Sequence, residues 1–227
     1  MTTAIAFFLL GLPAALFADY LVRRFTRAEE EIDDEDDIDE ADRVELPWQR
    51  GSGPDRLRLV VVATVPVLMA LAGRRFDTPQ ALGVSALLVA LVVCTATDLL
   101  RFRVPNAITY PGTLLALGLA IVMPDADPVG ALAAALLGGG MFLVLAILSR
   151  GGLGLGDVKL AVLIGAALGL PAGYQALFLG VILAGAVLLL FYVTGLVGRK
   201  QAVPYAPFLA IGAAVVVLLH GAAFAPL

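Results

Sequence analysis

Residues 80–100 read QALGVSALLVALVVCTATDLL, an apolar run that carries no charge before Asp98. Its length falls within the ~17–25 residues that an α-helix needs to cross the hydrocarbon core of a bilayer. The whole chain has the same character, because 60% of its 227 residues are hydrophobic and 15% are charged, whereas soluble domains are about 45–50% apolar. The run therefore predicts a membrane helix, and the composition excludes an ordinary water-soluble domain.

Seven further apolar stretches flank this one, and most of them also reach the length of a membrane helix. The sixth is short, so we expect it to depend on the glycine-rich segment before it or to be re-entrant. Glycine and alanine are frequent, as at residues 138–140 and 165–169, which predicts close helix packing in lipid. We predict an all-α polytopic membrane bundle of about eight transmembrane helices, at residues 4–22, 57–72, 80–100, 107–123, 129–148, 158–170, 174–197 and 206–224.

The positions of arginine and lysine predict that the N-terminus lies outside the cell, because basic residues favour cytoplasmic loops. With that orientation, all of the 15 basic residues except Arg74 and Arg75 lie in inner loops. The expected location is the cell (inner) membrane, with several crossings and lipid around the bundle.

An acidic segment separates the first predicted helix from the others. Thirteen of the 19 acidic residues lie between Glu29 and Asp55, and the segment has too little apolar surface to offset the entropy of ordering it. We expect three regions: a first helix at 1–22, an acidic, disordered cytosolic loop at 23–56, and a seven-helix membrane core at 57–227 that carries the candidate catalytic residues. No basic patch indicates nucleic-acid binding.

Cysteine and histidine are nearly absent from the chain. Cys94 is the one cysteine and His220 the one histidine, whereas a structural zinc site takes four such ligands. We therefore predict no metal site and no cofactor, and any catalysis has to come from carboxylates, amines or the backbone.

Asp98 and Asp157 are carboxylates at the ends of predicted membrane helices, and ionisable groups there are usually functional. The topology places both at the cytosolic boundary, where two carboxylates can share a proton, one activating water while the other stays acidic. Such a pair hydrolyses a peptide bond without a metal. The alternative is structural: Asp98 paired with Arg101 or Arg103, and Asp157 stabilised by the dipole at a helix N-terminus.

Two neighbouring features qualify this interpretation. Gly154 and Gly156 precede Asp157, and glycine permits close backbone approach and unusual dihedral angles, which suits an extended substrate strand. Asp19 also lies in a predicted helix, but Arg23 and Arg24 follow it, so we expect an interfacial ion pair there.

Three motifs occur in order: Thr97-Asp98 with Pro105-Asn106, then GLGDVKL at residues 154–160, then PYAPFLAIGA at residues 204–213. Together they resemble the bacterial type IV prepilin peptidases, the GxGD-type membrane aspartyl proteases. The resemblance implies an aspartic endopeptidase that removes the short basic leader from prepilins or pseudopilins at the cytosolic face. It implies Asp98 and Asp157 as the catalytic pair, and substrate-binding or site-shaping roles for Gly154, Gly156, Lys159, Pro105, Asn106, Pro204 and Pro207.

The chain departs from the pattern of that family in its N-terminal region. Many members carry paired CxxC motifs that bind zinc in the first cytosolic loop, and also N-methylate the new N-terminus. This chain has acidic residues there and no cysteine. We therefore expect neither zinc nor methyltransferase activity.

Two other functions fit a bundle with paired aspartates. A small proton-coupled transporter would use both as proton carriers, but such sites usually lie near the bilayer midplane on broken helices. A catalytically silent membrane scaffold with a charged segment for partners is the other alternative. The predicted position of Asp98 and Asp157 at the membrane edge favours the peptidase.

Overall fold

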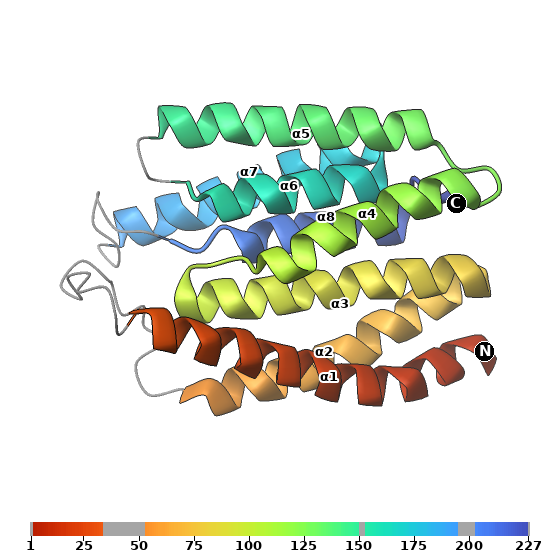
Figure 1. Cartoon of the computed structure of the whole chain (residues 1–227), viewed down its shortest axis with the longest axis horizontal. Coiled ribbons are helices and arrows are strands. Elements are labelled where there is room, and N and C mark those ends of the chain that lie inside the picture. Colours follow the sequence, from red (N-terminus) through yellow and green to blue (C-terminus); the bar gives the residue numbers. More distant parts are fainter. Residues whose placement is uncertain (1, 34–52, 150–152, 195–202, 227) are drawn as a thin grey trace.

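The computed structural model describes residues 2–33, 53–149, 153–194 and 203–226. Within these residues the chain forms helices that run side by side along the long axis of the molecule (Figure 1). A two-stranded antiparallel hairpin near the C-terminus pairs Gly221 with Pro226. The elements are α1 Thr2–Asp33, α2 Gly53–Arg75, α3 Thr78–Arg101, α4 Asn106–Val122, α5 Pro128–Leu148, α6 Leu155–Leu168, α7 Ala172–Val193, α8 Ala206–His220, β1 Gly221–Ala222 and β2 Ala225–Pro226.

The predicted all-α membrane bundle is confirmed. Five helices of the described residues are long and apolar enough to cross a membrane, namely α1, α2, α3, α5 and α7. α4 and α8 are apolar but shorter, with 17 and 15 residues, and α6 has 14. The short sixth stretch of the sequence is thus a short helix, which its neighbours surround in the bundle.

Two predicted boundaries are wrong. The eighth stretch does not continue to residue 224, because α8 ends where Gly221 adopts a φ of 88° and a ψ of −169°, a non-helical conformation that glycine adopts readily. α1 does not end at residue 22 but continues to Asp33, since arginine, alanine and glutamate are good helix formers in water. Residues 53–56 of the expected disordered loop are helical too, because α2 begins at Gly53, and residues 34–52 lie outside the described residues.

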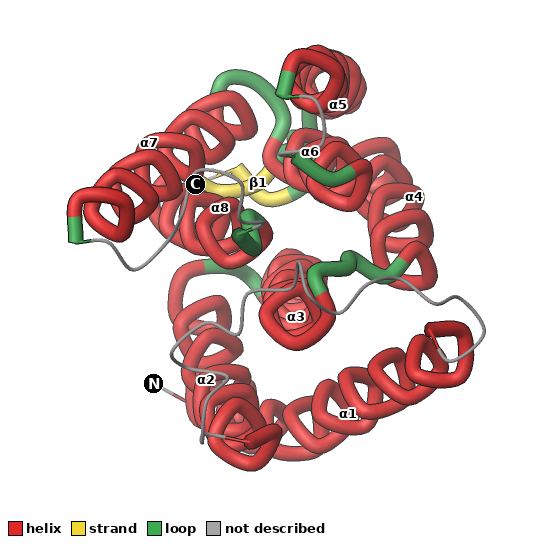
Figure 2. Tube along the Cα trace, turned by 90° about the vertical axis from the view of Figure 1, so that its left-hand side faces the viewer, coloured by secondary structure: helices red, strands yellow, loops and turns green. Residues whose placement is uncertain are grey.

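α3 is the central helix of the bundle. Seen along the helix axes, α1 and α2 lie on one side of α3, and α4, α6 and α8 lie on the other (Figure 2). α5 packs on α6, and α7 packs on α8. The helix that carries Asp98 therefore contacts both halves of the molecule.

Small residues form the tightest helix contacts, as the glycine content predicts. A Cβ on Gly165 of α6 would collide with the backbone carbonyl of Ala134 on α5. A Cβ on Gly138 would lie 2.7 Å from a methyl carbon of Leu177. Gly140 differs, because a Cβ there would meet nothing within 4 Å. Most of these glycines thus allow close helix approach in lipid.

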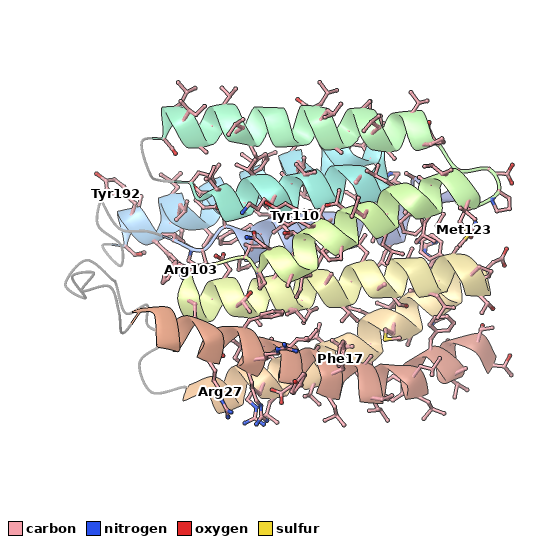
Figure 3. All side chains as sticks on the ribbon, viewed as in Figure 1. Phe17, Arg27, Arg103, Tyr110, Met123 and Tyr192 are labelled. Atoms are coloured by element: carbon pink, nitrogen blue, oxygen red, sulfur yellow. The ribbon has the colours of Figure 1, made fainter. Side chains whose placement is uncertain are left out.

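The helices alternate in direction, so that α3 ends, and α4, α6 and α8 begin, at the same end of the bundle (Figure 1). Arg27, Arg103 and Tyr192 lie toward this end, and Met123 lies at the opposite end (Figure 3). Both chain termini lie at the opposite end too (Figure 1).

Asp19 forms the expected ion pair, with one partner that the sequence does not indicate. Its Oδ2 lies 2.8 Å from Arg23 one helical turn later, and its Oδ1 lies 2.9 Å from Nε of Arg58 on α2. The carboxylate therefore links α1 to α2 and has a structural role.

Candidate active site

A cavity of about 410 Å³ opens at the end of the bundle where α3 ends and α4 and α6 begin. Its walls come from the last turn of α3, the turn that follows, and the first turns of α4 and α6. The lining residues are Asp98, Phe102, Arg103, Val104, Pro105, Asn106, Gly154, Leu155, Gly156, Asp157 and Lys159. Both candidate aspartates therefore face one cavity.

Asp98 is buried in the last turn of α3, with 5% of its surface exposed. Its Oδ2 accepts a hydrogen bond of 3.0 Å from the backbone N–H of Ala206, the first residue of α8. Backbone N–H groups at a helix N-terminus have no partner within the helix and bind carboxylates well. α8 thus holds one oxygen of Asp98 in place.

Phe102 makes the turn between α3 and α4 possible. It has a φ of 54°, and its N–H donates to the carbonyl oxygen of Asp98 at 2.8 Å. A left-handed conformation is uncommon for a bulky residue, and such strain concentrates at functional sites. The turn directs the chain into Val104 and Pro105 along the cavity wall.

Asp157 is the third residue of α6 and is 7% exposed. Its Oδ2 accepts the backbone N–H of Gly154 at 3.2 Å, and the helix N-terminus favours negative charge there. Its Oδ1 is buried and accepts no hydrogen bond from any residue that the structure describes. Since buried polar atoms normally have partners, this oxygen is available to a water molecule or a substrate.

The two glycines of the GLGD sequence have different surroundings. A Cβ on Gly156 would lie 3.1 Å from Cβ of Val104, so glycine lets α6 approach the turn after α3. Gly154 has φ −79° and ψ 153°, which any residue adopts. The close approach at Gly156 is to the chain's own Val104, and the approach of a substrate strand stays a prediction. Gly154 does not adopt unusual dihedral angles, because its N–H binds Asp157 with the backbone extended.

Lys159 reaches from α6 to α4. Its Nζ donates to Oδ1 of Asn106 at 2.7 Å and lies 5.5 Å from the ring centre of Tyr110. Tyr110 lies on α4, one turn after Asn106 (Figure 3). Lys159 and Asn106 both line the cavity, so their contact forms part of its rim.

Tyr205 precedes α8 and is half-buried. Burial, and to a smaller extent the nearby Asp157 carboxylate, raises the pKa of the Tyr205 phenol. The phenol therefore stays protonated near the aspartates and can act as a hydrogen-bond donor.

Seven of the nine predicted site residues line the cavity: Asp98, Pro105, Asn106, Gly154, Gly156, Asp157 and Lys159. Pro204 and Pro207 do not line it. They flank Tyr205 and Ala206, the segment whose backbone binds Asp98.

The sequence did not indicate four of the lining residues as site residues: Phe102, Arg103, Val104 and Leu155, of which Arg103 was named only as a possible structural partner of Asp98. Three of them lie between Asp98 and Pro105. The short connection between these two predicted site residues could have indicated that the residues within it lie at the site as well. The sequence could not indicate that the Ala206 N–H binds Asp98, because every residue except proline carries this donor.

No three histidine, cysteine, aspartate or glutamate side chains within the described ranges lie close enough together to hold a metal ion. Cys94 is buried in α3, and His220 is the last residue of α8. The polar groups of the residues that line the cavity are carboxylate, ammonium, guanidinium, amide and backbone groups.

The fold and the cavity define a class: a polytopic helical membrane protein with two buried carboxylates on one cavity at the end of the bundle. Residues 85–222 match the model of the type IV leader peptidase family. The chain belongs to this family, and the resemblance drawn from its motifs is confirmed. The matched region begins within α3, after α1 and α2.

The chain is also similar to the prepilin leader peptidase/N-methyltransferase of Bacillus subtilis (strain 168), with 31% identity over 157 residues. The similarity covers 68% of this chain and 62% of that relative, so the chain spans under two thirds of the relative's length. No solved structure matches the chain significantly.

Proposed function

We propose that the protein is an aspartic endopeptidase that removes short basic leader peptides from prepilins or pseudopilins at the cytosolic face of the cell membrane. The observation that carries the proposal is the pair of buried carboxylates, Asp98 and Asp157, on one cavity. Family membership supports a peptidase acting on such substrates. The Bacillus subtilis relative is named as a prepilin leader peptidase and N-methyltransferase.

The two carboxylates supply the chemistry of peptide hydrolysis. One carboxylate removes a proton from water, whose oxygen attacks the carbonyl carbon, while the other, protonated, donates to the carbonyl oxygen. Collapse of the tetrahedral intermediate then breaks the C–N bond, and the leaving amine takes up a proton. The buried Oδ1 of Asp157, which accepts no hydrogen bond within the described residues, offers a place for the attacking water.

Charge distribution supports the cytosolic orientation. The end of the bundle that carries the cavity also carries Arg27 and Arg103 (Figure 3), whereas Arg74 and Arg75 form the last turn of α2 at the opposite end (Figure 1). Arginine and lysine are enriched on the cytoplasmic side of membrane proteins. A leader peptide exposed to the cytosol would therefore meet the cavity directly.

A cleavage assay tests the proposal. We expect the full-length protein, co-expressed with a tagged prepilin, to shift the prepilin to a smaller species whose N-terminus begins after the leader. N-terminal sequencing identifies the bond, and a vector without the gene is the control. Intact prepilin, together with proton uptake by vesicles containing the protein, would instead support the transporter alternative.

We further propose that the protein works without zinc and without methyl transfer. One thiol and one imidazole, Cys94 and His220, cannot make a four-ligand zinc site. We expect less than about 0.1 zinc per chain by elemental analysis of the purified protein. Mass spectrometry should show the unmethylated mass for the new N-terminus of the cleaved pilin. One zinc per chain, or an added methyl group that depends on this protein, would contradict the proposal.

A further inference from the structure

The ammonium group of Lys159 joins two helices at the rim of the cavity. Nζ donates to Oδ1 of Asn106 at 2.7 Å and lies 5.5 Å from the ring centre of Tyr110. Asn106 is the first residue of α4, and Tyr110 follows four residues later, so both lie on one face of that helix. One side chain of α6 thus contacts two residues on a single face of α4.

This contact joins the two segments that carry the aspartates. Asp98 leads through the turn at residues 102–105 to Asn106, and Asp157 precedes Lys159 by two residues. Positions i and i+2 of a helix do not face each other, so Lys159 is directed toward α4 rather than along α6 toward Asp157. A hydrogen bond with a charged donor is stronger than a neutral one.

A second contact fixes the same junction. Gly156 packs against Val104, where a Cβ would lie 3.1 Å from Cβ of Val104. The start of α6 therefore rests on the turn after α3 through a steric contact. One turn later, on the same face of the helix, α6 is held to α4 by the Lys159–Asn106 hydrogen bond.

We propose that the Lys159–Asn106 hydrogen bond is a positioning contact that sets the distance between Asp98 and Asp157. The inference rests on the proposed peptidase function and deepens it. Among the hydrogen bonds of the described residues, none joins Lys159 or Asn106 to Asp98 or Asp157. Loss of the bond lets the start of α6 shift against α4, and displacements of about 1 Å from productive geometry can slow catalysis about 10²-fold.

The test measures kcat and KM for prepilin cleavage with Asn106→Ala, Lys159→Met and the double variant. We expect each single variant to lower kcat by about 10- to 100-fold with KM changed by less than about threefold. The double variant should be no slower than the worse single variant, because both changes remove one interaction. Lys159→Arg and Asn106→Asp keep a donor and an acceptor, and should retain most of kcat.

A matched control lies on α4. Thr113→Val removes a hydrogen bond of 2.8 Å to the carbonyl oxygen of Thr109 within that helix and should leave kcat unchanged. Thermal unfolding of all variants in detergent checks that the fold persists, and a lowered kcat with an unchanged unfolding temperature supports positioning.

Three results would overturn the inference while wild-type cleavage stands. One is unchanged kcat in the single variants. Another is a KM effect confined to Lys159→Met, which would show that the lysine binds substrate directly. The third is a double variant whose loss is the product of the two single losses. No cleavage by wild type would overturn the proposed function and this inference with it.

Discussion

Asparagine in place of Asp98 or Asp157 should lower kcat for prepilin cleavage by about 10²- to 10⁴-fold, the range that general acid–base groups contribute. Asparagine keeps the size and most of the hydrogen bonds of aspartate, but it can neither accept a proton from water nor share one. Asp98 would keep an oxygen for the Ala206 N–H, and Asp157 one for the Gly154 N–H. The fold should therefore survive both changes.

The measurement compares kcat of the two single variants and the double variant with wild type, after membrane insertion has been verified. Because the aspartates act as a unit, the double variant should be about as slow as either single variant. Asp127→Asn is a matched control, since Asp127 caps α5 by accepting the Gly130 N–H at 2.8 Å and asparagine caps equally well. Full activity in either active-site variant would rule out the catalytic pair.

The second large effect concerns Gly165 of α6, where alanine should destabilise the folded protein. In an isolated helix, alanine is more favourable than glycine by up to about 1 kcal/mol. In this bundle the added Cβ would collide with the backbone carbonyl of Ala134 on α5, and the backbone cannot rotate away as a side chain can. Overpacking of this kind costs about 1–3 kcal/mol, so the net effect should be a loss of stability.

Thermal unfolding in detergent measures this effect, with Gly140→Ala as the control. A Cβ at position 140 on α5 meets nothing within 4 Å. The higher helix propensity of alanine should therefore keep the unfolding temperature of this variant equal to that of wild type or raise it. Gly165→Ala should lower that temperature and also reduce kcat, because α6 carries Asp157. Equal unfolding temperatures for the two variants would contradict the prediction, because they would show that α5 and α6 can move apart at Gly165 without loss of stability.

The membrane helices follow from the sequence because lipid offers no hydrogen-bond partner to the backbone. Apolar runs such as residues 80–100 then have to form helices, and the structure has α3 at Thr78–Arg101. Helix ends outside the hydrocarbon are not subject to that constraint. The predicted ends at residues 22 and 224 failed for this reason, since local propensity and Gly221 decide where α1 and α8 stop.

Part of the site was also predictable. A carboxylate at a membrane helix end is costly and therefore conspicuous in an apolar sequence, which singled out Asp98 and Asp157 before any geometry was known. The GLGD sequence and the Pro105-Asn106 pair indicated further residues of the cavity through the resemblance to the prepilin peptidases. These signals are local, because each depends on residues adjacent in the chain.

The sequence by itself therefore determined the class of the molecule, its helices, its family and its two candidate aspartates. Only the tertiary structure decided that the backbone of Ala206 holds Asp98, that Lys159 binds Asn106, and that Gly165 lies against α5. These contacts join residues far apart in the chain and depend on how helices cross in three dimensions. They leave no periodic pattern, and a backbone N–H gives no sign in the sequence of what it binds.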